Sequence, residues 1–324
     1  MDFLENIAAA CADYKMIEKG DAVVAALSGG ADSVSLLHAL KTLSERLGVT
    51  ISACHINHHI RGDESDRDMH FCGELCDRLG VPLEIREADV PSMQQKHESL
   101  EECARRVRYE FFAEVSAGKK LATAHNSNDC AETVLLNMMR GTGLKGLCGV
   151  PPVRGNIIRP LIYCTRAEVE EYCRANGLSW VTDSTNLDTD YTRNRIRRII
   201  LPEMLKVNGS LFSTMNRMEH SLRSDSDFLD EMAAQKLEES RCPGGYSAEH
   251  LAGLPMPLLS RAIRMIFSDG GIEPSALRIN TAAQIIAEGR GKFNPCRGKF
   301  FVVKRGTVFV MEEEQHYKKH EKQP

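Results

Sequence analysis

Short apolar runs alternate with amphipathic segments through the first two hundred residues of the chain. The apolar runs, which are typical of buried strands, cover residues 21–27, 49–56, 82–88 and 119–125. Apolar positions in the intervening segments recur every three to four residues, which predicts helices over residues 31–48, 65–80, 99–118 and 127–141. Four strand–helix units in succession predict a doubly wound, mostly parallel α/β sheet of Rossmann-like type, with helices on both faces.

The pattern changes after about residue 210. Three helical segments follow one another, over residues 211–240, 257–271 and 276–289. Residues 298–314 alternate in the manner of a β-hairpin that turns at Arg305-Gly306. We therefore predict a first, α/β domain over residues 1–210 and a second, mainly helical domain over residues 211–324 that ends in a hairpin. The last residues, 316–324, are expected to be frayed.

Composition limits the class of protein. The 324 residues are 42% hydrophobic, which is enough for buried cores, and no window is apolar enough to span a membrane. The N-terminal segment carries acidic residues and no basic stretch, so no signal peptide is expected. The eleven cysteines are odd in number, scattered, and mostly in apolar contexts. These features favour free thiols in a reducing cytoplasm.

Charge is unevenly distributed, although the net charge is only −4. Residues 1–100 hold 9 Lys/Arg against 17 Asp/Glu, whereas residues 251–310 hold 9 against 3. The basic residues gather in two runs, at 193–198 and at 290–305. Ordinary solvated surface is one interpretation of each run. Two such runs in an acidic protein favour a polyanionic partner.

The stretch "SGGADS", residues 28–33, joins the first strand to its helix. A helix N-terminus offers unpaired N–H groups to an anion, and Gly29 and Gly30 let the backbone approach it closely. Ser28 and Ser33 add hydroxyl donors, and Ala31 begins the helix. Asp32 would repel phosphate unless Mg²⁺ bridged the two. The alternative is an aspartate that simply favours the helix dipole.

These residues resemble the SGGxDS loop of the N-type ATP pyrophosphatases, in which the loop holds pyrophosphate. Six further stretches resemble the tRNA(Ile)-lysidine synthetase family: "HINHHIRGDESDRD" (55–68), "SLEECARRVRYEFF" (99–112), "AHNSNDCAET" (124–133), "RGTGLKGLCGVPP" (140–152), "RPL" (159–161) and "DSTNLDTDYTRNRIRRIILP" (183–202). The resemblance is specific over residues 20–205 and weaker beyond.

The resemblance implies an adenine nucleotide α hydrolase-like fold and a ligase that forms a carbon–nitrogen bond. Such enzymes use ATP and Mg²⁺ to adenylate the wobble cytidine of an isoleucine tRNA with a CAU anticodon. The ε-amine of free lysine then attacks C2, giving lysidine, AMP and pyrophosphate. The sequence leaves a homodimer open, as well as how isoleucine and methionine tRNAs are told apart.

Candidate residues for this chemistry follow the third and fourth strands. Asp129 and Glu132 are spaced i, i+3 and share a helix face, where they could bind lysine and accept its proton. Two solvated helix acids are the alternative. Arg105 matches the family arginine that would stabilise the α-phosphate, with Arg106 and Arg108 as competitors. Arg197 resembles a second active-site arginine or could grip tRNA phosphates.

Two histidines are assigned to the nucleotide. His125 heads the segment that contains Asp129, and could instead only pack the strand end. His55 belongs to "HINHH", where we expect a loop near the adenine rather than a zinc site.

The chain also departs from the family pattern. Asn128 and Cys130 stand where the family has an acid and a glutamine, and a further C-terminal β-rich domain of longer members is not expected here. Alternatives are a tRNA 2-thiolation enzyme, disfavoured by the lack of CxxC pairs, an amide-forming synthetase for small molecules, and a non-catalytic ATP- or tRNA-binding module.

Overall fold

The computed structural model describes residues 2–60, 62–181 and 191–312. The chain divides into two compact units, residues 1–220 and 221–324. The division falls inside helix α11 (Leu211–Glu239), whose first residue follows the predicted boundary directly. Residues 183–190 of the last family-like stretch, Arg61 and the tail at 316–324 lie outside the described residues.

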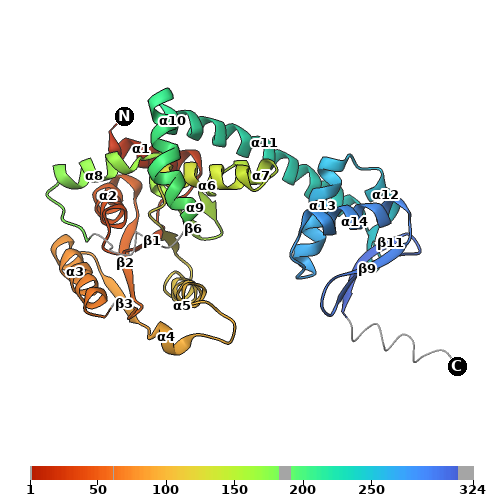
Figure 1. Ribbon diagram of the computed structural model, residues 1–324, viewed down its shortest axis with the longest axis horizontal. Helices are drawn as coiled ribbons and strands as arrows, with labels where there is room; N and C mark the ends of the chain where they lie inside the picture. Colours follow the sequence, from red (N-terminus) through yellow and green to blue (C-terminus); the bar gives the residue numbers. More distant parts are fainter. Residues whose placement is uncertain (1, 61, 182–190, 313–324) are drawn as a thin grey trace. The chain divides into compact units, whose positions relative to one another are not determined.

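The first unit contains the parallel sheet that the sequence predicted. Its strands are β1 (Ala22–Ala26), β2 (Thr50–Asn57), β3 (Leu83–Glu87), β4 (Lys120–Ala122), β5 (Val153–Arg154) and β6 (Ile157–Ile158). Their order is β3-β2-β1-β4-β6-β5, and every pair is parallel except β5 with β6. The predicted fold class is therefore confirmed (Figure 1).

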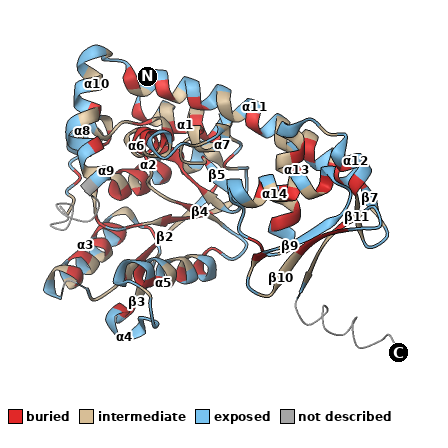
Figure 2. Ribbon diagram, turned by 45° about the vertical axis from the view of Figure 1, so that its right-hand side comes forward, coloured by how far each residue is buried: buried red, intermediate tan, exposed pale blue. Residues whose placement is uncertain are grey.

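Helices connect and cover these strands. They are α1 (Phe3–Asp13), α2 (Ala31–Leu47), α3 (Asp63–Leu79), α4 (Val90–Met93), α5 (Leu100–Val115), α6 (Ser127–Met139), α7 (Leu144–Leu147), η1 (Pro160–Tyr163), α8 (Arg166–Ala175), α9 (Tyr191–Arg195), η3 (Ile196–Ile200) and α10 (Leu201–Val207). Buried positions lie on the central strands and on helix α2, whose Leu36, Leu37 and Leu40 are fully buried (Figure 2). This apolar core holds the carboxyl ends of the strands in place.

Local sequence signals explain where the helices begin and end. Gly48 and Gly80 end α2 and α3 in the left-handed conformation, as their positions in the sequence predicted. Ser99 and Glu102 form a capping box at the start of α5. Asn126 and Asp129 form another at the start of α6, so Asp129 stabilises the helix that carries it.

The second unit combines helices with an antiparallel sheet. Its helices are α12 (Ala248–Ala252), α13 (Met256–Asp269) and α14 (Ala276–Ala287), and its strands are β7 (Arg241–Cys242), β8 (Gly245–Ser247), β9 (Gly291–Cys296), β10 (Lys299–Lys304) and β11 (Thr307–Glu312). The sheet order is β7-β8-β11-β10-β9. Phe267 packs edge-on against Phe301 in its core, with ring centroids 5.4 Å apart.

The sequence anticipated only part of this second sheet. Strands β10 and β11 form a hairpin around Arg305 and Gly306, which both have positive φ. Strand β9 contains Pro295 and lies at the sheet edge, the place where a proline is tolerated in a sheet. A run with glycine, asparagine and proline does not resemble a strand, which is why the sequence did not reveal β9.

No helix among the described residues is both long enough and apolar enough to cross a membrane.

Candidate active site

The strand order brings two polar loops together. Strands β1 and β4 are parallel neighbours, although about a hundred residues separate them in the sequence. Helix α2 follows β1, and helix α6 follows β4. Open α/β sheets form their binding crevices at such a switch in strand order, beyond the carboxyl ends. The contact is direct, because Asn126 Nδ2 at the start of α6 donates to Asp32 Oδ1 on α2 at 2.9 Å.

The glycine turn has the geometry of an anion cradle. Gly29 has φ +87° and is buried against Phe71, Cys72 and Val181, so a side chain there would be strained. Gly30 is the N-cap of α2 and supplies no side chain to the first-turn N–H groups. These groups are therefore oriented toward an anion at the helix N-terminus.

Two serine side chains form hydrogen bonds within the turn. The Ser33 hydroxyl accepts from the Ser28 N–H at 3.1 Å and donates to the Gly30 carbonyl at 2.9 Å. The Ser28 hydroxyl lies 3.2 Å from that of Ser33 and is exposed. Ser33 thus shapes the loop, while the Ser28 hydroxyl, although bonded to Ser33, lies at the exposed surface of the loop. Ala31, the first helical residue, is buried.

Asp32 lies in a charged and largely desolvated setting. Burial raises the pKa of its carboxyl, and the nearby Asp129 raises it further, against the lowering effects of Arg166 and Asn126. Arg166 Nη1, at the start of α8, forms an ion pair with Asp32 Oδ2. A carboxylate held in this way favours a cation beside it.

Asp129 and Glu132 lie on one face of α6, as their spacing predicted. Glu132 is completely buried, and it accepts from Arg193 Nε at 2.7 Å and from Arg197 Nε at 2.5 Å. Asp129 is more accessible, and its Oδ1 lies 3.4 Å from Arg193 and 3.6 Å from Arg197. The two carboxylates therefore share a pair of arginines.

Arg197 belongs to η3, a π-helical segment, and such segments are frequent at functional sites. The carboxylates of Glu132, Asp129 and Asp32 all raise its pKa, with the hydrogen bond to Glu132 as the largest cause. The structure thus brings four predicted residues into one cluster: Asp32, Asp129, Glu132 and Arg197.

His125 directly precedes the N-cap of α6, and Arg105 lies on α5. His125 Nδ1 is 3.2 Å from Thr123 Oγ1, and burial lowers its pKa, with Asp129 opposing and Arg159, Arg193 and Arg105 contributing. Arg105 is exposed, and its guanidinium lies over the Tyr109 ring at 5.0 Å.

The two competing arginines of α5 have other partners. Arg106 Nε donates to Glu98 at 2.9 Å and so anchors the segment before the helix. Arg108 approaches His58 Nε2 at 3.5 Å. Arg105, by contrast, forms no ion pair among the described residues and lies over the Tyr109 ring.

His55 lies directly below the glycine turn. Its Nδ1 is 2.8 Å from the Leu27 carbonyl, and burial lowers its pKa, so the ring is neutral and donates from Nδ1. Its buried Nε2 has no hydrogen-bond partner among the described residues. Neighbouring His58 is neutral as well, because burial, Arg108 and His55 lower its pKa to about 4. His55 and His58 therefore offer neutral ring nitrogens to this region and add no positive charge.

Three residues of the cluster were not assigned to it from the sequence. Asn126 is an N-cap within the quoted stretch, and Arg193 was counted only in a basic run. Arg166 gave no signal, since it begins a helix outside the family-like stretches. The side-chain oxygen of Asn128 accepts the Arg166 N–H at 2.9 Å and thereby ties α8 to α6.

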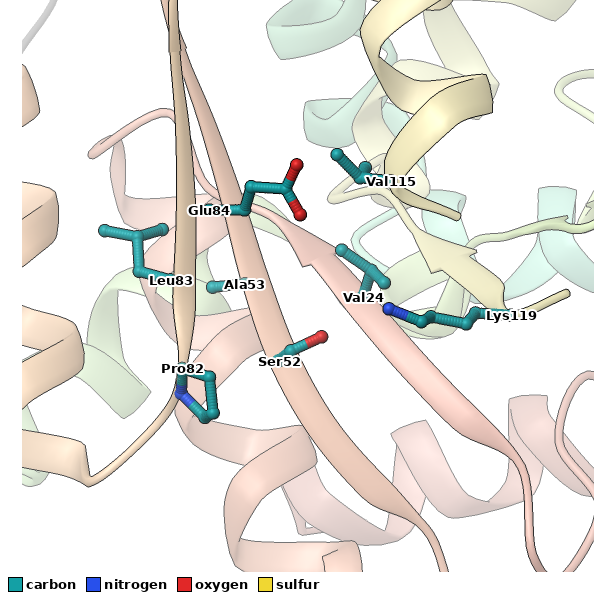
Figure 3. Close-up of a pocket in the computed structure, with 8 residues that line it drawn as sticks. All are labelled: Val24, Ser52, Ala53, Pro82, Leu83, Glu84, Val115 and Lys119. Atoms are coloured by element: carbon teal, nitrogen blue, oxygen red, sulfur yellow. The ribbon is translucent and has the colours of Figure 1, made fainter. Parts of the chain in front are cut away.

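The cavity in Figure 3 is separate from this cluster. It measures about 330 Å³ and is lined by residues that include Ser52, Pro82, Glu84 and Lys119. These residues lie toward the amino ends of β2, β3 and β4, whereas Asp32 follows the carboxyl end of β1. No group of three or more His, Cys, Asp or Glu side chains suited to a metal occurs in the described ranges.

Comparison with known families agrees with this geometry. The PP-loop domain family matches residues 3–204, which is more than half of the chain. The chain therefore belongs to the PP-loop domain family.

The relatives within that family are more specific. The chain is 44% identical over 232 residues to tRNA(Ile)-lysidine synthase of Clostridioides difficile (strain 630), covering 70% of this chain and 50% of that protein. It is 36% identical over 268 residues to the protein of the same name from Bacillus subtilis (strain 168), covering 79% and 57%. The chain thus spans about half the length of the curated relatives it matches.

A solved structure shares the fold. The U34-tRNA thiolase NcsA from Methanococcus maripaludis, described with its [4Fe-4S] cluster, superposes with a TM-score of 0.56 at 19% identity, covering 67% of this chain and 77% of that one. This likeness concerns the fold alone.

Proposed function

We propose that the protein is an ATP-dependent ligase that joins lysine to C2 of the wobble cytidine in an isoleucine tRNA with a CAU anticodon. The observation that carries the proposal is the junction of the glycine turn with α6, where Asp32 meets Asn126 and Asp129. The identity of the substrate is inferred from the relatives named tRNA(Ile)-lysidine synthase.

In the first step, the O2 atom of the cytidine attacks the α-phosphorus of ATP and pyrophosphate leaves. The N–H groups at the start of α2 and the Ser28 hydroxyl would bind the leaving pyrophosphate. Arg105, which is exposed and within electrostatic range of His125, would stabilise the charge that develops on the α-phosphate. The ring of His125 would face the nucleoside, and the buried His55 would act on the nucleoside side through the Leu27 carbonyl that its Nδ1 holds.

Magnesium fits the acidic side of this site. Burial and Asp129 both disfavour a negative charge on Asp32, and a divalent cation would offset that cost. Asp32 would hold the ion together with phosphate oxygens, since Mg²⁺ in nucleotide sites takes few protein ligands. When bound, the ion neutralises phosphate charge during displacement.

In the second step, the lysine ε-amine attacks C2, the bond from C2 to O2 breaks, and AMP leaves with that oxygen. The ammonium must first lose a proton, which near pH 7 costs roughly 4–5 kcal/mol from a pKa of about 10.4. Both Glu132 oxygens accept from arginines, while Asp129 is more accessible. We assign proton acceptance to Asp129 and charge organisation to Glu132.

The second unit would supply surface for the tRNA. Arg290, Lys292, Arg297, Lys304 and Arg305 are exposed around β9–β11. Lys299 differs from them, because its ammonium donates to the carbonyls of Gly270 and Gly271 at 2.6 and 3.3 Å. Lys299 therefore caps α13, and the other five are the candidates for phosphate contact.

A tRNA 2-thiolation activity is the weaker candidate. The sequence has no CxxC pair, and nine of the eleven free cysteines are buried. Buried thiols fit a reducing cytoplasm better than they fit cluster or persulfide chemistry.

The proposal is tested by supplying the protein with ATP, Mg²⁺, radiolabelled lysine and an isoleucine tRNA transcript with a C wobble base. Label should enter the RNA only when ATP is present. A transcript with U at the wobble position is the matched control and should stay unlabelled. Equal labelling of both transcripts, or none of either, would refute the assignment of the substrate.

A further inference from the structure

We propose that Arg166 is a pyrophosphate-binding residue, which pairs with Asp32 in the free enzyme and turns to the β- and γ-phosphates when Mg·ATP binds. This inference rests on the proposed function and adds to it a residue that lies outside the glycine turn and the family-like stretches.

The position of Arg166 is determined by contacts on both sides. Its Nη1 meets Asp32 on the phosphate loop, and its Nε donates to Glu170 Oε1 at 3.0 Å. Helix α8 packs against α2, where the Cys173 thiol reaches the Ala31 carbonyl at 3.6 Å. The guanidinium is therefore held at the N-terminus of α2, where the pyrophosphate is expected.

The backbone of Arg166 is fixed while its side chain can move. Thr165 and Glu168 form a capping box at the start of α8, and Asn128 accepts the Arg166 N–H. The Arg166 side chain is 43% exposed. A shift from carboxylate to phosphate thus needs only side-chain rotation, with Glu170 as a constant partner.

Charge balance gives the reason for such a shift. The cluster pairs the carboxylates of Asp32, Asp129 and Glu132 with the guanidinium groups of Arg166, Arg193 and Arg197. A Mg²⁺ ion at Asp32 would take the oxygen that Arg166 now occupies. The displaced guanidinium would then be available to phosphate, and its planar fork of donors suits bidentate binding of phosphate oxygens.

The test measures binding of Mg²⁺-pyrophosphate to the nucleotide-free protein by calorimetry, without turnover. Arg166→Ala should weaken binding roughly tenfold to a hundredfold, as expected for a lost charge-assisted hydrogen bond. Arg166→Lys, which keeps the charge and loses the fork, should fall in between. Arg174→Ala is the matched control, since Arg174 shares Glu170 at 2.9 Å and has no contact with Asp32 in the described structure. It should bind within twofold of the wild type.

Each other outcome overturns the inference. If Arg166→Ala binds as well as the wild type, Arg166 does not contact phosphate. If it binds more tightly, Arg166 only competes with Mg²⁺ for Asp32. In both cases the proposed function survives, because the wild type binds. If the wild type binds no Mg²⁺-pyrophosphate, the proposed function fails together with this role. If Arg166→Ala does not fold, the test rests on Arg166→Lys. An affinity of Arg166→Lys for Mg²⁺-pyrophosphate equal to that of the wild type would then refute the role of Arg166.

Discussion

Asp32 is the residue where the demands of folding and of chemistry conflict. It lies at the start of α2, partly buried, with Asp129 close enough to raise its pKa. Neither burial nor a second carboxylate helps an aspartate to ionise. The arrangement is reasonable for a site that receives a cation, and it is unfavourable for the nucleotide-free protein.

This conflict predicts a stability difference that depends on pH. Because the folded-state pKa of Asp32 is raised, its contribution to the free energy of unfolding is complete below the ordinary aspartate pKa of about 4 and is lost as pH rises through the folded-state value. Asp32→Asn should therefore melt near the wild-type temperature at pH 4 and above it at pH 7.5. It should also lose turnover. Thermal melts at both pH values check this, and a variant that is less stable at pH 7.5 would contradict it.

At the level of single residues, the sequence indicated the functional acids and glycines, but it did not indicate which side chains pair with the acids. The spacing of Asp129 and Glu132 on one helix is a local property, and it predicted their common face. The partnership of Asp32 with Arg166 joins positions 134 residues apart and depends on how α8 packs. No local pattern contains that information.

At the scale of elements, α6 and the segment formed by α9 and η3 act as one unit. Glu132, fully buried on α6, is the acceptor that holds Arg193 of α9 and Arg197 of η3. A buried carboxylate with two arginine partners is a strong anchor, although the exposure of both arginines reduces its energetic value.

Glu132→Gln should therefore loosen residues 191–200 as well as impair lysine use. The amide keeps the shape but removes the charge, and we expect destabilisation of roughly 1–3 kcal/mol. Limited trypsin digestion should cut after Arg193, Arg195 or Arg197 several-fold faster. Glu203→Gln is the control, because Glu203 pairs only with exposed Lys206 in the described structure. Equal cleavage of Glu132→Gln and wild type would show that Glu132 does not anchor the segment.

Elements were predicted well where periodicity was strong. The four predicted helices of the α/β region are present, since each has a buried apolar face and a glycine or capping signal. Strand β4, Lys120–Ala122, lies within the predicted run at 119–125 but is shorter, and β9, which contains a proline, was not predicted. Pairing with neighbouring strands determines the extent of β4 and the existence of β9, and a local pattern does not encode that pairing.

At the scale of the whole molecule, charge is distributed unevenly, with an excess of acidic residues over positions 1–100 and an excess of basic residues over positions 251–310. Chemistry is assigned to residues 1–220, and phosphate contact to the surface of β9–β11. The sequence identified this basic surface by charge counting. It could not show that Lys299 turns inward to cap α13.

Substitutions on this surface should separate binding from folding. Replacing Arg297, Lys304 and Arg305 together with alanine should weaken tRNA binding and reduce its salt dependence by roughly 0.7–0.9 per lost phosphate contact, with little change in melting temperature. Lys299→Met should instead lower the melting temperature, since two carbonyls lose their donor. Filter binding across salt concentrations tests the triple variant, and an unchanged salt slope would remove this surface from the tRNA interface.

The proposed ligation is tested most directly by following ATP that is labelled at its α-phosphate. The protein is incubated with Mg²⁺, the isoleucine tRNA transcript and lysine, and each substrate is omitted in turn. Lysine ligation through an adenylated cytidine requires both lysine and tRNA for the release of labelled AMP, with pyrophosphate as the other product. Labelled ADP, or AMP release that is indifferent to lysine, would contradict the assignment of this PP-loop site to lysine ligation.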